Sequence, residues 1–512
     1  MNKFNVKKMS TLVKLKTAIA VSTMTLLGAL CYGSVCNPFT VFTVLAEKNS
    51  SNSVHPLTLK PSDEVFTSLN EFPKRGGATD WGLALSGGGI RSAAYSVGAL
   101  KALYDVGLLK DIDVISSVSG GGFASYWIYS NFYMSKNQTP EFGAAALEDS
   151  AFVKNVCLLQ KNGDFMSISK ALKAFLQSKQ GAFSTYQGSI ERTFGNDINT
   201  NVKLDYLSAE IAATRAPYFI INTTQWSRKW DGETNIFELT PTYMGCANWG
   251  KVSWGVGSPA LPLNKSIAVS AAAIKGKLGQ EINNVLFPEP ASNLWLSDGG
   301  HKENLAAFGL ITRGMPNVII VDAEFDSKYE FGSYQKLVKL LNLAGFKLNV
   351  KEIDDFIKKN GSSKKRDTFE GSSVCIGRAT SNDGNKSSKI FYIKMALTPN
   401  VKQLFKDKKI TDRGKAIDKV VEDTFYKHET QTCDCYDRFK QYPKGIDEQS
   451  RMYAYITGRY SGWLNGRIIW RLLNYRFPQT TTNDQSYYTD QFDAFIGLGY
   501  LETLPIKSYV KQ

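Results

Sequence analysis

Ser119 stands where an apolar run meets a cluster of glycines. The run covers residues 112–118, and glycines occupy residues 120–122. A serine at a strand-to-helix corner takes a strained backbone that leaves its hydroxyl projecting alone, and the corner needs small residues two positions away on each side. Ser117 and Gly121 meet that need, although the usual pattern has glycine at both positions. The spacing predicts a nucleophile at Ser119, with an ordinary glycine-rich turn as the alternative.

A second glycine-rich turn lies earlier in the chain. The apolar run 81–85 is followed by Ser-Gly-Gly-Gly-Ile-Arg at 86–91 and then by apolar residues at helical spacing. Such glycines let successive backbone N–H groups face one point, and the start of the helix adds a partial positive charge there. The loop can therefore hold a phosphate or an oxyanion. Nucleotide binding is disfavoured because Ser92 replaces the third glycine of the dinucleotide fingerprint and the Gly-Lys-Ser/Thr pattern is absent.

A third apolar run, residues 294–297, delivers Asp298 to another glycine turn. A carboxylate at hydrogen-bond distance can accept the proton of a serine hydroxyl without a histidine relay. The chain has three histidines, and none follows Ser119 at the end of a distinct late strand, as a Ser-His-Asp hydrolase requires. His301 is the alternative proton acceptor, because it lies one turn beyond Asp298; its other interpretation is a cap or packing residue at a helix start.

With these three segments the chain resembles the patatin-like phospholipases and, more distantly, the catalytic domains of cytosolic phospholipase A2. Residues 86–91 are similar to the family's oxyanion loop with its trailing arginine. Residues 117–121, Ser-Val-Ser-Gly-Gly, are similar to its nucleophile elbow, and residues 298–300 to its catalytic Asp-Gly-Gly segment. The similarity is specific over residues 75–330 and loose over the remainder.

The resemblance implies an α/β fold, a three-layer sandwich with a mostly parallel central sheet and helical additions. It also implies a catalytic dyad of Ser119 and Asp298. The predicted oxyanion hole consists of the backbone amides of Gly87, Gly88, Gly89 and Gly120. Arg91 is expected near the mouth of this hole, where a guanidinium can hold two oxygens of a substrate phosphate. The alternative for Arg91 is a pairing beneath the loop that only fixes the shape of the loop.

These expectations lead to a serine lipid acyl hydrolase that cleaves fatty-acyl esters of phospholipids or lysophospholipids through an acyl-enzyme. Two alternatives stay open: acyl transfer to another lipid by the same dyad, and a catalytically silent lipid-binding protein. Retention of both Ser119 and Asp298 argues against the silent protein. The residues demand no metal ion and no cofactor. The expected partner is a phospholipid or a membrane surface.

Composition agrees with a globular enzyme. The chain has 512 residues, of which 43% are hydrophobic, so it can bury a large core. The net charge is +14, and five of the lysines lie in the first 46 residues, which contain no acid. A basic surface favours anionic lipid or nucleic acid. No zinc-finger spacing, basic zipper or RNA-recognition signature accompanies it, so the sequence predicts no nucleic-acid partner.

Residues 1–46 read as a signal peptide or membrane anchor, because lysines precede a mainly apolar stretch. Cleavage after Ala46 would give a secreted protein. An uncleaved anchor over residues 17–37 would give an envelope-associated one. A lipoprotein site at Cys31 or Cys36 is the weaker alternative, since neither cysteine follows a good lipobox.

The remaining boundaries follow from composition shifts. Residues 47–74 are polar and predict a linker; residues 75–330 form the predicted catalytic domain, and residues 331–512 a helical extension packed on the core. Residues 140–215 predict helices that form either a lid or a layer over the sheet, and residues 358–389 predict a solvated loop.

Two cysteines in this extension, Cys433 and Cys435, have no second pair nearby and are interpreted as thiols rather than zinc ligands.

Overall fold

The computed structural model describes residues 68–72, 80–133, 179–195, 202–214, 216–226, 234–247, 250–254, 260–272, 295–360, 369–401, 477–479 and 489–510. The predicted signal peptide or anchor at 1–46 lies outside these residues, as do Cys433, Cys435, most of the predicted linker at 47–74 and parts of the region 140–215. Among the described residues, no helix combines the length and the apolar character that a membrane crossing requires.

Parallel strands form the centre of an eleven-stranded sheet in the described part of the chain. In spatial order they are β3 (Tyr218–Trp226), β2 (Val114–Val118), β1 (Trp81–Leu85), β8 (Asn317–Asp322) and β11 (Ser387–Lys394). Their residues are largely apolar without alternation, as expected for strands that are covered on both faces. Leu83 on β1, for example, pairs with Ile115 and Ile319, and all three are fully buried. The predicted mostly parallel α/β sheet is confirmed.

Antiparallel strands extend both sides of this centre. From β3 the sheet continues through β4 (Thr234–Leu239), β5 (Tyr243–Cys246) and β6 (Gly250–Ser253). From β11 it continues through β10 (Cys375–Ser381) and β9 (Phe346–Asn349). The sheet therefore runs on past residue 330, so the predicted boundary there does not coincide with an edge of the sheet. Part of the predicted loop at 358–389 is strand β10.

A short strand, β7 (Trp295–Asp298), explains how the site is assembled. It pairs antiparallel with the second half of β3, so that Asp298 lies opposite Thr223. The first half of β3 pairs with β2, and Val118 lies opposite Asn222. Strands β2 and β7 therefore end beside adjacent residues of β3, Asn222 and Thr223. This arrangement brings Ser119 and Asp298 together although they are far apart in sequence.

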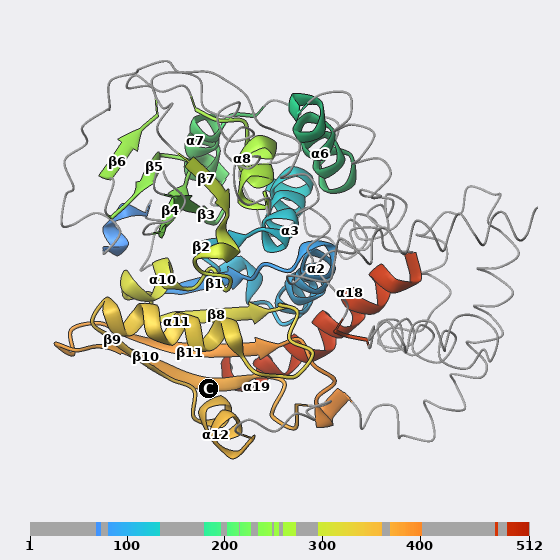
Figure 1. Cartoon of the computed structure of the whole chain (residues 1–512), viewed down its shortest axis with the longest axis vertical. Helices are drawn as coiled ribbons and strands as arrows, with labels where there is room; N and C mark the ends of the chain where they lie inside the picture. The colour runs from blue at the N-terminus through green and yellow to red at the C-terminus, as the bar shows by residue number, and fades with distance from the viewer. Residues whose placement is uncertain are drawn as a thin grey trace, which may run out of the picture.

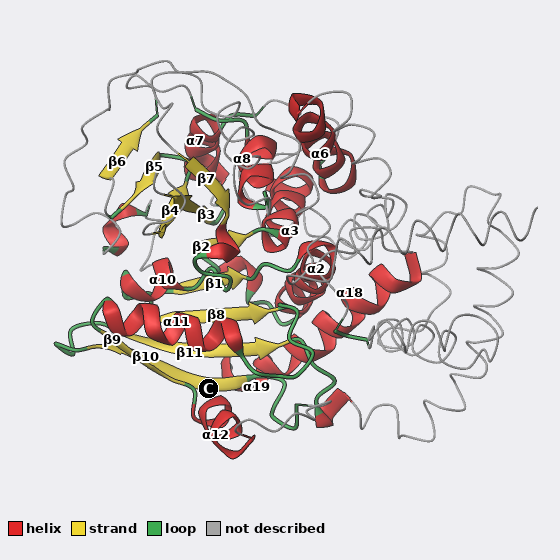
Figure 2. Ribbon diagram, in the orientation of Figure 1, coloured by secondary structure: helices red, strands yellow, loops and turns green. Residues whose placement is uncertain are grey.

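Helices cover both faces of the sheet. One group is α2 (Gly89–Asp105), α3 (Gly120–Ile128), α6 (Lys179–Phe194), α7 (Leu204–Thr214) and α8 (Leu263–Ser270). A second group is α10 (Phe308–Thr312), α11 (Gly332–Leu343) and α12 (Lys351–Asn360). Strands β2 and β3 lie on one side of β1, and β8 and β11 on the other. Right-handed crossovers therefore place α2 and α3 on one face and α11 on the opposite face, which gives the layers seen in Figures 1 and 2.

Two features of the helical layers matter for the site. Helix α6 packs against α3 and α8, which favours the covering layer over the lid for this part of the region 140–215. Near the C-terminus, α18 (Thr489–Thr503) packs along α2, as Figure 1 shows with α18 in red and α2 in blue. A Cβ on Gly98 would lie 2.0 Å from the carbonyl oxygen of Ile496, and a Cβ on Gly499 would lie 2.0 Å from that of Tyr95. Glycine on each helix thus allows the two backbones to touch.

Candidate active site

Ser119 occupies the corner between β2 and α3 in a backbone conformation that side chains rarely adopt. Its φ and ψ are 51° and −118°. Such a conformation costs on the order of 1–3 kcal/mol and persists only when the surroundings hold it. The Ser119 amide donates to Ser270 Oγ at 2.9 Å, and the Ser270 hydroxyl donates to the carbonyl oxygen of Asn222 at 2.6 Å. Helix α8 therefore pins the corner that the sequence predicted.

The glycines beside Ser119 are required by close packing between the two glycine-rich turns. A Cβ on Gly120 would lie 2.1 Å from the carbonyl oxygen of Gly89, and one on Gly121 would lie 2.3 Å from that of Leu85. Ser117 fills the position where the usual pattern has glycine. It is fully buried, and its hydroxyl has no hydrogen-bond partner among the described residues.

Asp298 faces Ser119 directly. The Ser119 hydroxyl donates to Asp298 Oδ2 at 2.9 Å, and the amide of Gly300 donates to Oδ1 at 2.8 Å. A backbone bond from the Asp298 amide to the carbonyl oxygen of Ala272, at 3.0 Å, fixes the end of β7. Ser119 and Asp298 are 6% and 8% exposed. The carboxylate is thus oriented by one oxygen and available to the serine through the other.

The glycine loop before α2 contributes amides beside Ser119. The amide of Gly87 donates to the carbonyl oxygen of Asn304 at 2.9 Å, so it holds the loop rather than facing a substrate. Gly88 and Gly89 have φ of 145° and 66°, values open mainly to glycine. Their amides, with that of Gly120 at the start of α3, belong to first helical turns, whose N–H groups have no partner inside the helix. Gly88, Gly89 and Gly120 are therefore the candidate donors that remain from the predicted set, and Gly88 lines the cavity at the dyad.

Arg91 lies beneath this loop. Its side chain is fully buried, and Nε donates to the carbonyl oxygen of Ala323 at 3.1 Å. The centre of its guanidinium is 5.9 Å from the centroid of the Phe325 ring. A buried guanidinium cannot hold a phosphate at the mouth of the site. The placement corrects the expected substrate contact and favours the alternative in which Arg91 fixes the loop.

His301 follows Asp298 in the short helix η5 (Gly299–His301) and is held by other groups. The indole N–H of Trp226 donates to Ser297 Oγ at 2.6 Å, and Ser297 Oγ is 2.9 Å from His301 Nδ1. Ser297 Oγ and His301 Nδ1 therefore share a hydrogen bond whose direction depends on the tautomer of the imidazole. The proton acceptor in contact with Ser119 is Asp298, which favours the dyad over a histidine base.

A cavity of about 370 Å³ opens onto the dyad. Its lining residues are Gly88, Ser119, Asp298, Gly300, His301, Asn304, Glu324, Phe325, Gly332, Ser333 and Lys336. Asn304, Glu324, Phe325, Ser333 and Lys336 were not predicted from the sequence. They reach the site from the loop after η5, the segment after β8 and the first turns of α11.

Two of these residues give the cavity an apolar edge and a cation. Phe325 is 45% exposed and forms the apolar edge. Lys336 Nζ donates to the carbonyl oxygen of His301 at 2.7 Å.

A buried ion cluster supports this side of the cavity. Lys394 Nζ lies 2.9 Å from Asp322, 3.1 Å from Asp326 and 3.4 Å from Glu324. Burial raises the pKa of Glu324 above its usual range, and the charge of Lys394 only partly offsets this effect. Burial also acts on Asp326, but Lys394 and the amides of Phe331 and Glu330 outweigh it and lower the pKa of that carboxyl.

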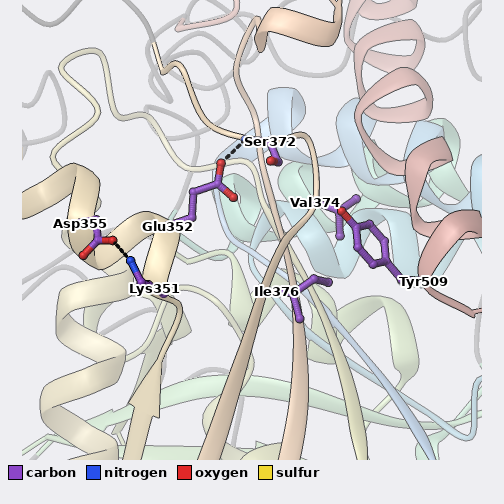
Figure 3. A pocket seen from close by; sticks show the side chains of 7 residues that line it. All are labelled: Lys351, Glu352, Asp355, Ser372, Val374, Ile376 and Tyr509. Carbon is purple, nitrogen blue, oxygen red and sulfur yellow. Dashed lines mark hydrogen bonds and ion pairs between the residues drawn. The ribbon is translucent and has the colours of Figure 1, made fainter.

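A second pocket, of about 460 Å³, lies on other elements of the protein. Figure 3 shows its lining residues: Lys351, Glu352, Asp355, Ser372, Val374, Ile376 and Tyr509. They come from α12, from β10 and the residues before it, and from α19 (Lys507–Val510). The pocket contains neither glycine loop and no member of the dyad. Among the described residues, His, Cys, Asp and Glu side chains form no group of three that could hold a metal ion.

Comparison with solved structures finds similarity to human GIVD cytosolic phospholipase A2. That structure is 10% identical, with 84% of this chain and 59% of that chain covered and a TM-score of 0.49. The same protein in complex with methyl gamma-linolenyl fluorophosphonate and terbium chloride is 12% identical, with 84% and 58% covered and a TM-score of 0.47. The chain therefore spans less than two thirds of the length of these structures.

Comparison with curated protein sequences finds no match. Among protein families, residues 83–237 match the one described as patatin-like phospholipase. The matched segment contains the glycine loop and Ser119, and strand β7 brings Asp298 to it from outside the match. Residues 83–237 of this chain are therefore similar to the patatin-like phospholipase family.

Proposed function

We propose that this protein is a serine lipid acyl hydrolase. The observation that carries the proposal is the 2.9 Å hydrogen bond from the Ser119 hydroxyl to Asp298 Oδ2. A strained serine bonded to an oriented carboxylate, next to amides that lack helical partners, is the equipment of nucleophilic acyl transfer. The match of residues 83–237 to a phospholipase family supports a lipid ester as the substrate.

The geometry supports a two-step mechanism. Ser119 Oγ attacks the ester carbonyl carbon while Asp298 takes the hydroxyl proton. The carbonyl oxygen becomes an oxyanion, which the amides of Gly88, Gly89 and Gly120 stabilise by roughly 3 kcal/mol per donor. The intermediate collapses to an acyl-serine, and Asp298 returns the proton to the departing alcohol. Water, deprotonated by Asp298, then attacks the acyl-serine and releases the fatty acid and the free serine.

Phospholipids and lysophospholipids are the substrates that we propose within this class. The cavity combines an exposed aromatic ring, Phe325, with a cation, Lys336. An acyl chain can pack against the ring, and a phosphate can bind the ammonium group. Asp298 and Glu324 also line the cavity. Both carboxylates have bonds within the protein, the former to Ser119 and Gly300 and the latter to Lys394 and Ser333.

The proposal is tested by assaying the full-length chain on phospholipids, lysophospholipids and neutral esters. We expect Ser119→Ala and Asp298→Asn each to lower kcat by at least about 10³-fold, because the pair acts as a unit in forming the acyl-enzyme. His301→Ala should retain most of the rate. A His301→Ala variant as inactive as Ser119→Ala, together with an active Asp298→Asn, would contradict the dyad. Transfer of the acyl group to an added lipid alcohol, without free fatty acid, would identify an acyltransferase instead.

A further inference from the structure

Three polar side chains of the cavity form one continuous hydrogen-bonded chain. Asn304 Nδ2 donates to Ser333 Oγ at 3.3 Å, and the Ser333 hydroxyl donates to Glu324 Oε2. Glu324 Oε1 also accepts from the amide of Ser333 at 3.2 Å. All three residues line the same cavity as Ser119. The proposed chemistry uses none of them.

One end of this chain reaches both loops of the active site. The carbonyl oxygen of Asn304 accepts from the amide of Gly87, the residue that opens the oxyanion loop. Asn304 Oδ1 is so close to both loops that a Cβ on Gly87 would lie 2.2 Å from it, and a Cβ on Gly300 2.5 Å. Gly300 in turn donates its amide to Asp298 Oδ1. Asn304 is therefore wedged between the oxyanion loop and the loop that carries Asp298.

The other end of the chain is anchored in the ion cluster. Glu324 lies 3.4 Å from Lys394, whose side chain is fully buried, and Lys394 is paired with Asp322 at the end of β8. A charged pair in a low-dielectric interior strengthens the hydrogen bonds that continue from it, and the loss of one member is felt by the others. The position of Glu324 is thus set by the core of the sheet.

A cap for helix α11 would explain only part of this arrangement. An acidic side chain at a helix N-terminus stabilises the first amides, and the bond from the Ser333 amide to Glu324 does so here. Capping makes no use of the bond between Ser333 Oγ and Asn304, which leads away from the helix to the two catalytic loops.

We propose that Glu324 and Ser333 are positioning residues that fix the oxyanion loop and the Asp298 loop relative to each other through Asn304. The proposal rests on the proposed hydrolase function for its kinetic consequence. Its structural consequence, the order of the two loops, does not depend on that function.

The kinetic test uses the full-length chain with a lysophospholipid and an uncharged nitrophenyl ester. We expect Ser333→Ala to lower kcat about tenfold on both substrates and to leave KM within about twofold, because a displaced oxyanion loop weakens contacts made only in the transition state. Glu324→Gln should show a similar loss, and the double variant should lose little more than either single one. Ser333→Thr, which keeps the hydroxyl, should restore most of kcat.

Ser381→Ala is the matched control. The Ser381 hydroxyl also donates to a carboxylate, Asp383, but on an exposed turn between β10 and β11. Its kcat and KM should equal those of the unmodified chain. A Ser333→Ala protein that unfolds at lower temperature but keeps the kcat of the unmodified chain would overturn the proposal and leave only the cap.

Hydrogen–deuterium exchange provides a readout that needs no activity. Peptides covering residues 86–92 and 298–305 should exchange faster in Ser333→Ala, and peptides of β10 should not. If Ser333→Ala does not fold, the same exchange measurement is made on Glu324→Gln, because glutamine has nearly the same shape as glutamate. Unchanged exchange in both loops of a folded variant would overturn the proposal. Faster exchange in both loops would support the positioning role even if the Ser119→Ala variant kept most of the esterase rate, a result that would remove the hydrolase proposal alone.

Discussion

Two cations near the oxyanion loop, Arg91 and Lys336, differ in what they can reach. Arg91 is fully buried and bonded to the carbonyl oxygen of Ala323, whereas Lys336 lines the cavity and is held by that of His301. A fully buried side chain acts on the substrate only by shaping what covers it, while a cation at the cavity wall can contact an anionic group directly. We therefore expect substitution of Lys336 to affect only substrates that carry a phosphate, and substitution of Arg91 to affect charged and uncharged substrates alike.

We expect Lys336→Gln to raise KM for a phospholipid about tenfold and to leave KM for an uncharged ester nearly unchanged, since a charged hydrogen bond contributes roughly 1.5–3 kcal/mol and each 1.4 kcal/mol is tenfold in affinity. Arg91→Lys should lower the rate equally on both substrates, because lysine lacks the Nε–H group that bonds the Ala323 carbonyl oxygen beneath the loop. Steady-state kinetics on the two substrates measure both effects.

Lys339→Gln is the control for charge alone, because Lys339 is an exposed lysine on the same helix, α11. A Lys336→Gln variant whose loss is the same on both substrates would contradict phosphate recognition by this residue. A selective loss in Arg91→Lys would return that role to Arg91.

The residues that the sequence identified are those that follow apolar runs directly. Ser119, Asp298 and the glycine loop all stand at the ends of strands, and strand ends are readable from a single local pattern. Glu324, Ser333 and Lys336 were missed because their place at the cavity depends on how the segment after β8 folds back over the site. Asn304 carried a weak signal, its position just beyond the Asp-Gly-Gly turn.

At the scale of elements, the contact between α2 and α18 is made by two glycines. Each faces a backbone carbonyl of the other helix at a distance that leaves no room for a methyl group. Glycine inside a helix usually lowers stability by about 0.5–1 kcal/mol relative to alanine. Here the close packing of the two helices offsets that cost.

We expect Gly499→Ala to lower the free energy of unfolding by about 1–3 kcal/mol, because its Cβ would overlap the Tyr95 carbonyl oxygen and push the helices apart. Chemical denaturation measures the change. Gly188→Ala in α6 is the matched control, since its Cβ would meet only a flexible arginine end at 3.4 Å. That variant should be neutral or more stable. Equal effects at both glycines would show that helix propensity, rather than the contact, decides the outcome.

The elements of the sheet centre were predictable, and those of its flanks were not. Strands β1 and β2 lie within the apolar runs 81–85 and 112–118 that the sequence analysis identified. Residues 331–512 were predicted to form a helical extension, and residues 358–389 within it a solvated loop, because lysine, serine, glycine and asparagine are frequent there. Strand β9 at the edge of the sheet and β10 next to it need only one apolar face, so their composition resembles that of loops. The apolar run in β11, Lys-Ile-Phe-Tyr-Ile-Lys at 389–394, was an available signal for a strand.

At the scale of the whole molecule, the ion cluster around Lys394 joins distant parts of the chain. It ties β11 to β8 through Asp322 and to the start of α11 through Asp326. The amide of Asp326 also donates to the side chain of Gln479 at 2.7 Å, which brings in the C-terminal segment. Residues 1–67 lie outside the described part of the chain, so export and its route stay predictions from the sequence.

We expect Lys394→Met to lower the free energy of unfolding at pH 7 by about 3–5 kcal/mol, because it leaves buried carboxylates without their counter-charge. The deficit should shrink as the pH falls toward 5. Without Lys394, burial and mutual repulsion raise the pKa values of Glu324 and Asp326 in the folded state. The folded variant then binds more protons than the unfolded chain, so acid stabilises it relative to the unmodified protein.

Denaturation of both proteins across this pH range checks the sign. Lys389→Met is the control, because Lys389 lies on the same strand but outside the cluster. A deficit that stays constant with pH would show that lost packing, not unpaired charge, causes the destabilisation.

The packing of α18 on α2 joins a helix that is synthesised early to one that is synthesised much later. Helix α2 begins at the oxyanion loop and is among the first described elements of the chain, whereas α18 is among the last described elements. Domains fold as units, and contacts between distant parts of a sequence form late. A nascent chain that stops before α18 therefore leaves one side of α2, the helix that follows the oxyanion loop, uncovered. A fragment that contains α2 but lacks α18 should therefore be cleaved faster by a protease than a chain that contains both helices.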